Sequence, residues 1–312
     1  MKSVSVVIPT FNSLRTIETC LISIRNQDYQ GKVEIIVADG GSTDGTKAIL
    51  EKYNCKIVEE RSASPETAKA TGLKQARGEL VLLMASDNIL PQKNWLKIMV
   101  NSLIKEPRAI AAYPWRYAYR KEDSSLNRYF ALMGANDPVA WFMGKADRRG
   151  WGEAKDKIKF GLVKFTPENM PTLGDNGVLA WREKLLKAQV DEQHFSHIDV
   201  FWDLVNLGLD QFVVVKNEII HDTGEEFWLF MKKRFRYMKS LYLGQLKMRR
   251  YKWVRGYGDV VKLGGYCVYS LTLVGPVITA IRGWLKKPDW AWFWQIVMAP
   301  AMVIVYGLAL IL

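Results

Sequence analysis

Two carboxylate side chains that could bind a ligand or a metal follow apolar stretches of the sequence. Asp39 follows VEIIVA in the segment VADGGSTDGT, and Asp87 follows LLM in the segment LLMASDNILP. In an open α/β sheet, ligands bind outside the carboxyl ends of the strands, and both aspartates are expected at such ends. Asp, Gly and Ser are also ordinary turn residues. The residues alone therefore leave Asp87 as either a metal-bearing carboxylate or a polar turn residue.

The elements that must position these aspartates alternate between strand and helix. Apolar runs predict strands, and apolar residues at helical spacing predict helices between them. The expected strands are residues 4–9, 33–38, 56–58, 79–84 and 109–114, and the main helices are residues 14–27, 65–77 and 92–104. This order predicts a parallel sheet with right-handed crossovers. Residues 115–223 are less regular and should extend the sheet and supply specificity-determining loops.

Composition narrows the class of partner and the compartment. The chain has 312 residues, of which 49% are hydrophobic, and a net charge of +12. This length allows one large domain with an attachment, and this charge indicates an anionic partner. Cys20, Cys55 and Cys267 show no paired spacing, which favours a reducing compartment over a disulfide framework. The first strand ends in IPTFN, so the G-x-G-x-x-G of a dinucleotide-binding unit is absent there.

The last third of the chain is expected to meet a membrane. Residues 228–262 mix many Lys and Arg residues with aromatics, which suits helices lying on an anionic membrane surface. Residues 263–281 and 290–312 carry no charge and are long enough to span a bilayer. They predict a two-span hairpin, with the first segment alternatively re-entrant at Gly275-Pro276. The basic block should keep the preceding domain on the cytoplasmic side.

The motifs, taken in order, resemble one family. VSVVIPTFN, VADGGSTDGT, ARGELVLLMASDN and a late H-D-x-G before a basic helix are similar to the family 2 glycosyltransferases, including membrane-anchored polyprenyl-phosphate sugar transferases. The resemblance covers roughly residues 4–236. It implies an α/β fold of the GT-A type, with a Rossmann-like mixed sheet and C-terminal membrane helices. The expected organisation is a GT-A domain at 1–225, basic interfacial helices at 226–262 and two membrane segments at 263–312.

The resemblance also implies roles for individual residues that bind the nucleotide sugar. Pro9, Thr10 and Asn12 would line the nucleotide pocket, and Asp39 would recognise the base or the ribose. Lys69 falls where the family usually has an Arg near the donor.

The metal site is implied by a partial match. Asp87 matches the last residue of the family's D-x-D, but Ala85 replaces the first carboxylate. One carboxylate with diphosphate oxygens and water can still hold Mg²⁺ or Mn²⁺, and Ser86 offers a neutral oxygen nearby. His221, in NEIIHDTG, matches a family histidine that reaches the metal or the diphosphate.

The sequence offers three candidates for the catalytic base. Inverting transfer to a hydroxyl needs a carboxylate to accept its proton. Within HFSHIDVFWDLVNLG, Asp199 matches the family's acidic pair best, Asp203 lies one turn further on, and Asp175 is a third candidate better suited to substrate binding. A phosphate acceptor would need cations more than a base, and six basic residues in the middle of the chain could supply them: Arg116, Arg120, Arg128, Lys145, Arg148 and Arg149.

These expectations combine into one function with two alternatives. Arg234 and Arg236, in KKRFRYMKS, would touch either the diphosphate or lipid phosphates. The expected function is inverting transfer of a sugar from a UDP- or GDP-linked donor to a lipid-linked acceptor at the cytoplasmic face of the cell membrane. The loss of the first carboxylate leaves a non-catalytic adaptor as the main alternative. The net charge alone would also fit a nucleic-acid-binding membrane protein, but the uncharged C-terminal segments argue against nucleic acid as a partner.

Overall fold

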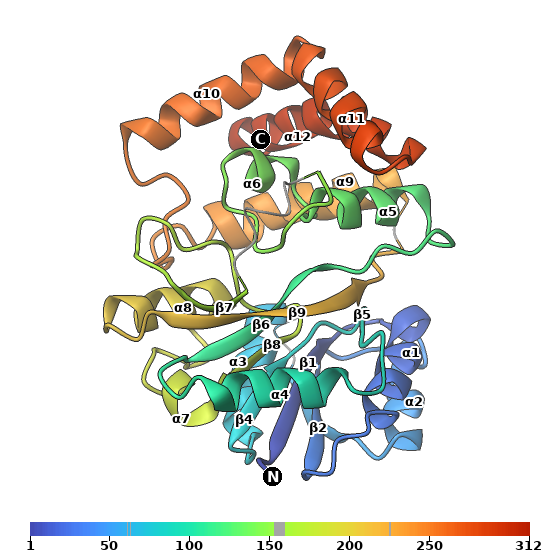
Figure 1. Cartoon of the computed structure of the whole chain (residues 1–312), viewed down its shortest axis with the longest axis vertical. Coiled ribbons are helices and arrows are strands. Elements are labelled where there is room, and N and C mark those ends of the chain that lie inside the picture. Colours follow the sequence, from blue (N-terminus) through green and yellow to red (C-terminus); the bar gives the residue numbers. More distant parts are fainter. Residues whose placement is uncertain (61, 63, 153–159, 225) are drawn as a thin grey trace. The chain divides into compact units, whose positions relative to one another are not determined.

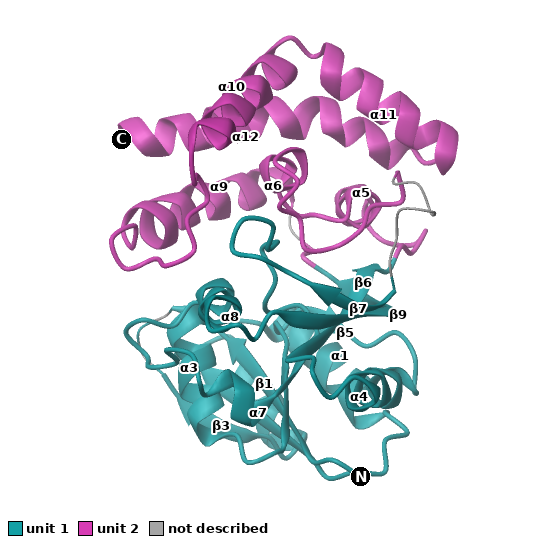
Figure 2. Ribbon diagram, turned by 60° about the vertical axis from the view of Figure 1, so that its left-hand side comes forward, with its two compact units in different colours: residues 1–118, 159–222 teal, residues 119–158, 223–312 magenta. Residues whose placement is uncertain are grey.

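A computed structural model describes residues 1–60, 62, 64–152, 160–224 and 226–312 of the chain. Its contacts divide the chain into two compact units, which Figure 2 colours separately. Unit 1 contains residues 1–118 and 159–222, and unit 2 contains residues 119–158 and 223–312. Residues 119–152 thus group with the C-terminal helices, whereas the sequence had placed them in the first domain.

Unit 1 is an α/β unit whose elements follow the predicted order. Its strands are β1 (Val4–Thr10), β2 (Val33–Asp39), β3 (Lys56–Glu59), β4 (Leu80–Leu83), β5 (Asn88–Ile89), β6 (Ala111–Tyr117), β7 (Gly161–Lys164), β8 (Val178–Trp181) and β9 (Gln211–His221). Its helices are α1 (Leu14–Arg25), α2 (Thr46–Lys52), α3 (Pro65–Gln75), α4 (Trp95–Lys105), α7 (Arg182–Leu185) and α8 (His197–Asn206). Figure 1 shows α4 lying across the face of the sheet nearest the viewer.

The strands of the described residues form one mixed sheet in the order β3-β2-β1-β4-β8-β6-β9-β5, with β7 also paired to β9. β3, β2, β1 and β4 are mutually parallel, as the alternating pattern predicts. β8 then runs antiparallel to both β4 and β6. β1 is buried along its whole length, as expected for the centre of a parallel sheet covered on both faces. The middle of the chain therefore extends the sheet, as predicted.

Two local predictions differ from the structure. The helix expected from Gln92 begins at Trp95, because the Gln92 carbonyl accepts the Trp95 N–H and closes a turn first. The residues after Asp87 form the short strand β5, which pairs with the end of β9. A two-residue strand leaves no alternating pattern in the sequence, so it cannot be recognised without its partner.

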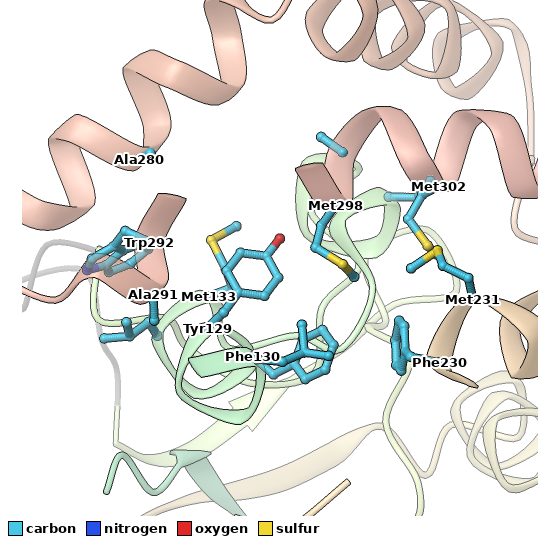
Figure 3. Packing of buried hydrophobic residues seen from close by; sticks show 14 of the residues in the cluster. Tyr129, Phe130, Met133, Phe230, Met231, Ala280, Ala291, Trp292, Met298 and Met302 are labelled. Atoms are coloured by element: carbon cyan, nitrogen blue, oxygen red, sulfur yellow. The ribbon is translucent and has the colours of Figure 1, made fainter. Parts of the chain in front are cut away.

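Unit 2 is helical. It contains α5 (Ser125–Met133), α6 (Pro138–Phe142), α9 (Phe227–Tyr237), the π-helical turn η2 (Met238–Leu243), α10 (Tyr257–Leu271), α11 (Val274–Lys286), the 3₁₀ turn η3 (Trp290–Phe293) and α12 (Trp294–Ile311). Its core joins α5 to the C-terminal helices. Figure 3 shows Met302 and Met231 meeting beside Phe230, whose ring centroid lies 4.9 Å from that of Phe130.

One continuous helical segment of the described residues, Trp290–Ile311, is long and apolar enough to cross a membrane. α10 and α11 qualify only as a pair, and they are bent by 81° at their junction. The bend lies at Thr272-Leu273 rather than at Gly275-Pro276, and Leu273 has the positive φ of 60° there. The structure thus gives the first apolar segment a sharp break, which is the feature expected of a broken or re-entrant segment.

Candidate active site

The site is built at the carboxyl ends of the parallel strands of unit 1. The register of β1 with β2 places Thr10 opposite Asp39, and β4 lies on the other side of β1. The ends of these three strands and the loops that follow them carry six of the residues singled out in the sequence: Pro9, Thr10, Asn12, Asp39, Ser86 and Asp87. Parallel strands end at the same edge of a sheet, so these loops gather in one place.

Asp39 and Asn12 form one hydrogen-bonded network between two of these loops. The Asp39 carboxylate is buried and accepts the N–H groups of Gly41 at 3.1 Å and Ser42 at 3.0 Å, together with the Ser42 hydroxyl at 2.5 Å. Asn12 donates its N–H to Ser42 Oγ at 2.9 Å and accepts the Thr43 N–H at 2.9 Å. Asp39 therefore fixes the turn after β2.

Pro9 and Thr10 form the end of β1. Both are buried, and the Thr10 hydroxyl has no hydrogen-bond partner among the described residues. A buried hydroxyl without a partner costs free energy, so it is a natural contact for a ligand. The sequence predicted that Thr10 lies at the end of the first strand. Only the structure shows that its hydroxyl lacks a hydrogen-bond partner among the described residues.

Asp87 and His221 are brought together by the short strand β5. Asn88 pairs with His221 across β5 and β9, and the Asp87 carbonyl accepts the Asp222 N–H at 2.9 Å. As a result, Asp87 Oδ1 lies 3.3 Å from His221 Nε2, and both side chains are less than one fifth exposed. Ser86 Oγ lies 2.9 Å from Ser13 Oγ, at the start of α1.

A polar network connects Asp87 and His221 to the loop before β8. Asn88 is fully buried and donates to Asn176 Oδ1 at 3.1 Å, while Asn176 donates to the Tyr117 hydroxyl at 3.0 Å. The Tyr117 ring centroid lies 5.5 Å from that of His221. Sequence analysis missed Asn176 and Tyr117. The position of Asn176 beside Asp175 was the available signal.

Lys69 lies at the centre of a buried charge cluster. It is 2% exposed, and its Nζ donates to Glu66 Oε1 and to Asp175 Oδ2, both at 2.9 Å. His197 Nδ1 lies 3.2 Å from the same ammonium. The sequence indicated Lys69 and Asp175 separately, but their contact spans 106 residues of chain. It also missed Glu66, three residues before Lys69 on α3, and His197, at the start of α8.

The cluster holds its charges at neutral pH. Burial by itself would raise the pKa values of Glu66 and Asp175, but the nearby charges of His197 and Lys69 outweigh burial, and both carboxyl pKa values fall below their usual range. Burial would likewise lower the pKa of Lys69. The negative charges of Asp175 and Glu66 outweigh the effect of burial, and the pKa of Lys69 is raised. Lys69 is therefore a cation between two anions.

The two other acidic candidates for the base lie on α8. Asp199 is in its first turn and is 1% exposed. Asp203 is half-buried one turn later, and its Oδ2 accepts the Gln189 N–H at 3.4 Å.

Arg234 and Arg236 belong to α9 of unit 2. Arg234 donates to the Asn136 carbonyl at 2.7 Å, lies 3.9 Å from Asp137 and stacks over Phe230. The Arg236 guanidinium lies 5.9 Å from the Tyr237 ring centroid. Arg234 is thus engaged inside unit 2.

Comparison with known proteins identifies the class. A family model described as glycosyl transferase family 2 matches residues 5–165, slightly more than half of the chain. The chain therefore belongs to this family of glycosyltransferases, and the resemblance seen in its motifs is confirmed.

Among curated relatives, glycosyltransferase AglE of Haloferax volcanii is 31% identical over 107 residues, which cover 32% of this chain and 35% of AglE. The GalNAc(5)-diNAcBac-PP-undecaprenol beta-1,3-glucosyltransferase of Campylobacter jejuni is 37% identical over 141 residues, which cover 43% of this chain and 44% of that protein. The matches thus span less than half the length of these relatives.

Solved structures show the fold. The mannosyltransferase PcManGT of Pyrobaculum calidifontis, solved with GDP-Man and Mn²⁺, has a TM-score of 0.54 at 17% identity, covering 97% of this chain and 86% of PcManGT. Residues 1–349 of Staphylococcus aureus TarS have a TM-score of 0.50 at 18% identity, covering 95% and 90% of the two chains. The fold is therefore the mixed-sheet GT-A fold that the motifs implied.

Proposed function

We propose that the protein transfers one sugar, with inversion, from a UDP- or GDP-linked donor to a lipid-linked acceptor at the cytoplasmic face of the cell membrane. The observation that carries the proposal is the gathering of Thr10, Asp39 and Asp87 at the carboxyl ends of adjacent parallel strands. Family membership supplies the class of reaction. Together they support donor binding in unit 1.

The donor nucleotide would lie over the ends of β1 and β2. The Thr10 hydroxyl lacks a partner among the described residues, and Asn12 sits in the loop joined to Asp39. Asp39 accepts three hydrogen bonds from its own turn, so it acts on the base or ribose from a fixed position. Asp175, held by Lys69, would contact the donor sugar.

Asp87 and His221 fit a divalent cation. A carboxylate and an imidazole 3.3 Å apart are ligands that Mn²⁺ accepts, and Mg²⁺ would rely more on Asp87, with the donor's diphosphate completing either site. The described residues hold no group of three or more His, Cys, Asp or Glu placed to bind a metal. When bound, the ion would neutralise charge on the leaving diphosphate. Ser86 lies in the same loop as a further oxygen donor.

The chain's own residues would do the rest of the chemistry. The acceptor oxygen attacks the anomeric carbon from the side opposite the diphosphate, which gives inversion. The start of α8 is the source of a proton acceptor, and Asp199 is the residue that the family match indicates there. The exposed Arg236 would meet lipid phosphates, because α9 belongs to the helical unit that carries the apolar segments, whereas Arg234 is held by Asn136 and Asp137.

A lipid-linked acceptor and a membrane location are favoured by unit 2. Trp290–Ile311 is long enough to cross a membrane, and the bent pair α10 and α11 passes the same test together. The name of the Campylobacter jejuni relative includes an undecaprenol-linked saccharide as its substrate. We therefore propose that 226–262 lies on the membrane surface and that 263–312 enters the membrane.

A non-catalytic adaptor that binds a sugar nucleotide is the second candidate. It is favoured by Ala85, which stands where the family's first metal-binding carboxylate is expected. An adaptor would bind a sugar nucleotide without turning it over.

Calorimetric titration of the full chain in detergent tests the donor site. UDP-Glc, UDP-GlcNAc, UDP-Gal and GDP-Man are titrated with and without Mn²⁺. We expect one donor to bind with Mn²⁺, and the affinity of Asp87→Ala to fall at least about tenfold, which is the loss of about 1.4 kcal/mol of binding free energy. Asp28→Ala, at an exposed site in the same unit, should bind as the wild type does. Binding unaffected by Mn²⁺ and by Asp87→Ala would contradict the metal role.

A further inference from the structure

The connector between α11 and α12 is bonded to the segment that directly follows β6. Arg128, on α5, donates to Asp289 Oδ2 at 2.9 Å, and the Tyr119 hydroxyl donates to the same oxygen at 2.5 Å. The Lys287 ammonium lies 4.1 Å from the Tyr119 ring centroid, which is close enough for a cation–π contact. An ion pair, a hydrogen bond and a cation–π contact therefore hold the connector in place within unit 2.

These contacts limit how the C-terminal helices can meet a bilayer. In a hairpin of two spans, the connector would face the side of the membrane opposite to β6. Tyr119 comes two residues after the end of β6, whereas crossing the hydrocarbon core takes about 20 helical residues. The chain between β6 and Tyr119 is thus far too short to cross a bilayer. Because the connector is held at Tyr119, it must face the same side as the end of β6.

α12 is held near both of its ends. Near its carboxyl end, the Tyr306 hydroxyl donates to Oδ2 of Asp137, the N-cap of α6, at 2.5 Å. Near its amino end, Gln295 is fully buried. Its amide oxygen accepts the Tyr129 hydroxyl of α5 at 2.5 Å, and its amide nitrogen donates to the Tyr269 hydroxyl of α10 at 2.9 Å. α12 therefore lies along α5 and α6 instead of crossing a bilayer alone.

The break between α10 and α11 fits the surface of a membrane better than its centre. The two helices have 15 and 13 residues and are bent by 81°. At about 1.5 Å per residue each is roughly 20 Å long, which is shorter than the hydrocarbon core of about 30 Å. Leu273, the N-cap of α11, offers no side-chain hydrogen bond to the first N–H groups of that helix. Such groups need water or lipid head groups, and the centre of a bilayer has neither.

α10 and α11 each expose an apolar stripe and bury the opposite one. Tyr266 of α10 and Ala280 of α11 belong to the core of unit 2, whereas Val268 is 65% exposed and Leu285 is 68% exposed. Figures 1 and 2 both show α12 between this pair of helices and α6. The exposed apolar residues recur at spacings of three, four and seven, so they share one side of each helix. We call them the α10–α11 face: Val261, Val268, Leu271, Val274, Ile278 and Leu285.

The charges around the α10–α11 face favour an anionic lipid surface as its partner. The exposed Lys262 and Arg282 lie on the same two helices. Asp259 and Asp289 are the only acidic residues of 227–312, and each forms an ion pair inside unit 2. An apolar stripe flanked by Lys and Arg is typical of helices that lie in the interface of anionic lipids. A protein surface of mixed charge would leave this excess of positive charge uncompensated.

We propose that α10 and α11 lie in the plane of one membrane leaflet, with the α10–α11 face among the lipid chains and Lys262 and Arg282 at the lipid phosphates. None of the described helices of unit 2 then crosses the bilayer. This rests on the membrane location in the proposed function and replaces the two-span hairpin expected from composition. A lipid-linked acceptor would be met in the same leaflet, because the described helices do not reach the other one.

Labelling of introduced cysteines tests which side the connector faces. Pro288→Cys in the connector and Asp28→Cys in unit 1, both at exposed positions, are made in a full chain whose three native cysteines are changed to alanine. Inverted bacterial inner-membrane vesicles, whose cytoplasmic face points outward, are treated with a membrane-impermeant maleimide. We expect the two variants to be labelled to the same extent. Protection of Pro288→Cys in inverted vesicles, with labelling in intact spheroplasts, would show a two-span hairpin and overturn the proposal.

Quenching by brominated lipids tests how the two helices lie. Val261→Cys, Leu271→Cys and Leu285→Cys are labelled with bimane in vesicles of anionic phosphatidylglycerol brominated either near the head group or deep in the chains. We expect similar quenching at all three positions, stronger from the shallow bromine, because interfacial helices lie about 5–10 Å deep along their whole length. Leu207→Cys is the matched control, since Leu207 is 62% exposed in unit 1, and it should not be quenched.

The outcomes separate this inference from the proposed function. Failure of the wild type to sediment with vesicles overturns the membrane location itself. In a vesicle-bound chain, deep quenching at Leu271→Cys alone would indicate a re-entrant wedge and overturn only the in-plane arrangement. A vesicle-bound chain without quenching at any of the three positions would show that protein covers the α10–α11 face, which overturns lipid as its partner. Each variant should bind the donor selected by calorimetry as the wild type does, which shows that it is folded.

Discussion

At the scale of residues, the site is held by a few buried polar contacts rather than by a dense set of metal ligands. Asp39 fixes one turn, Asn88 joins two loops, and Lys69 holds two carboxylates. The sequence could single out Asp39, Lys69 and Asp87, because each stands in a motif. It could not pair Lys69 with Asp175 or place His197 beside Glu66, because those contacts depend on how α3 meets the loop before β8 and the start of α8 in the folded chain.

Lys69 provides a prediction of stability. Lys69→Met keeps most of the side-chain length but leaves the buried Glu66 and the partly buried Asp175 without their shared cation. Removing one partner of a buried ion pair costs about 3–5 kcal/mol. We expect the free energy of unfolding in urea to fall by that amount, whereas Lys97→Met, on the exposed side of α4, should change it by less than about 0.5 kcal/mol. Equal stability of the two variants would show that the cluster does not stabilise unit 1.

At the scale of elements, the alternation of strands and helices was predictable as far as β6, because buried strands leave long apolar runs. The antiparallel strand β8 and the short strand β5 were not, because each is defined by its partner in the sheet. The apolar C-terminal segments were recognised from composition. The 81° bend between α10 and α11 was not placed correctly, because Leu273 has no marked tendency to adopt a positive φ.

The helical elements of unit 2 predict how the protein partitions in cells. If α10, α11 and α12 enter the bilayer, the full chain should sediment with membranes and remain there after washing at high salt and at alkaline pH. Surface attachment through the basic residues of α9 alone would be reversed by high salt, because salt screens exposed charges. Release of the protein by either wash would contradict the insertion of these segments. An immunoblot of the membrane and soluble fractions gives the answer.

At the scale of the whole molecule, the chain combines a GT-A unit with a helical unit that carries its apolar segments. The fold class could be inferred from the order of the motifs. The division into units could not, because residues 119–152 pack with helices that follow more than seventy residues later. We expect the GT-A unit and the helical unit together to transfer a sugar to a lipid-linked acceptor, and this is the central claim.

The most direct test is to follow the sugar. The purified full chain is incubated with Mn²⁺, the radiolabelled donor that it binds, and either polyprenyl phosphate or a mixture of lipid-linked saccharides. Label is then counted in the organic-soluble fraction. We expect label with at least one of the two acceptors, and none with Asp87→Ala. Donor binding without transfer to either acceptor would contradict the central claim and favour the adaptor.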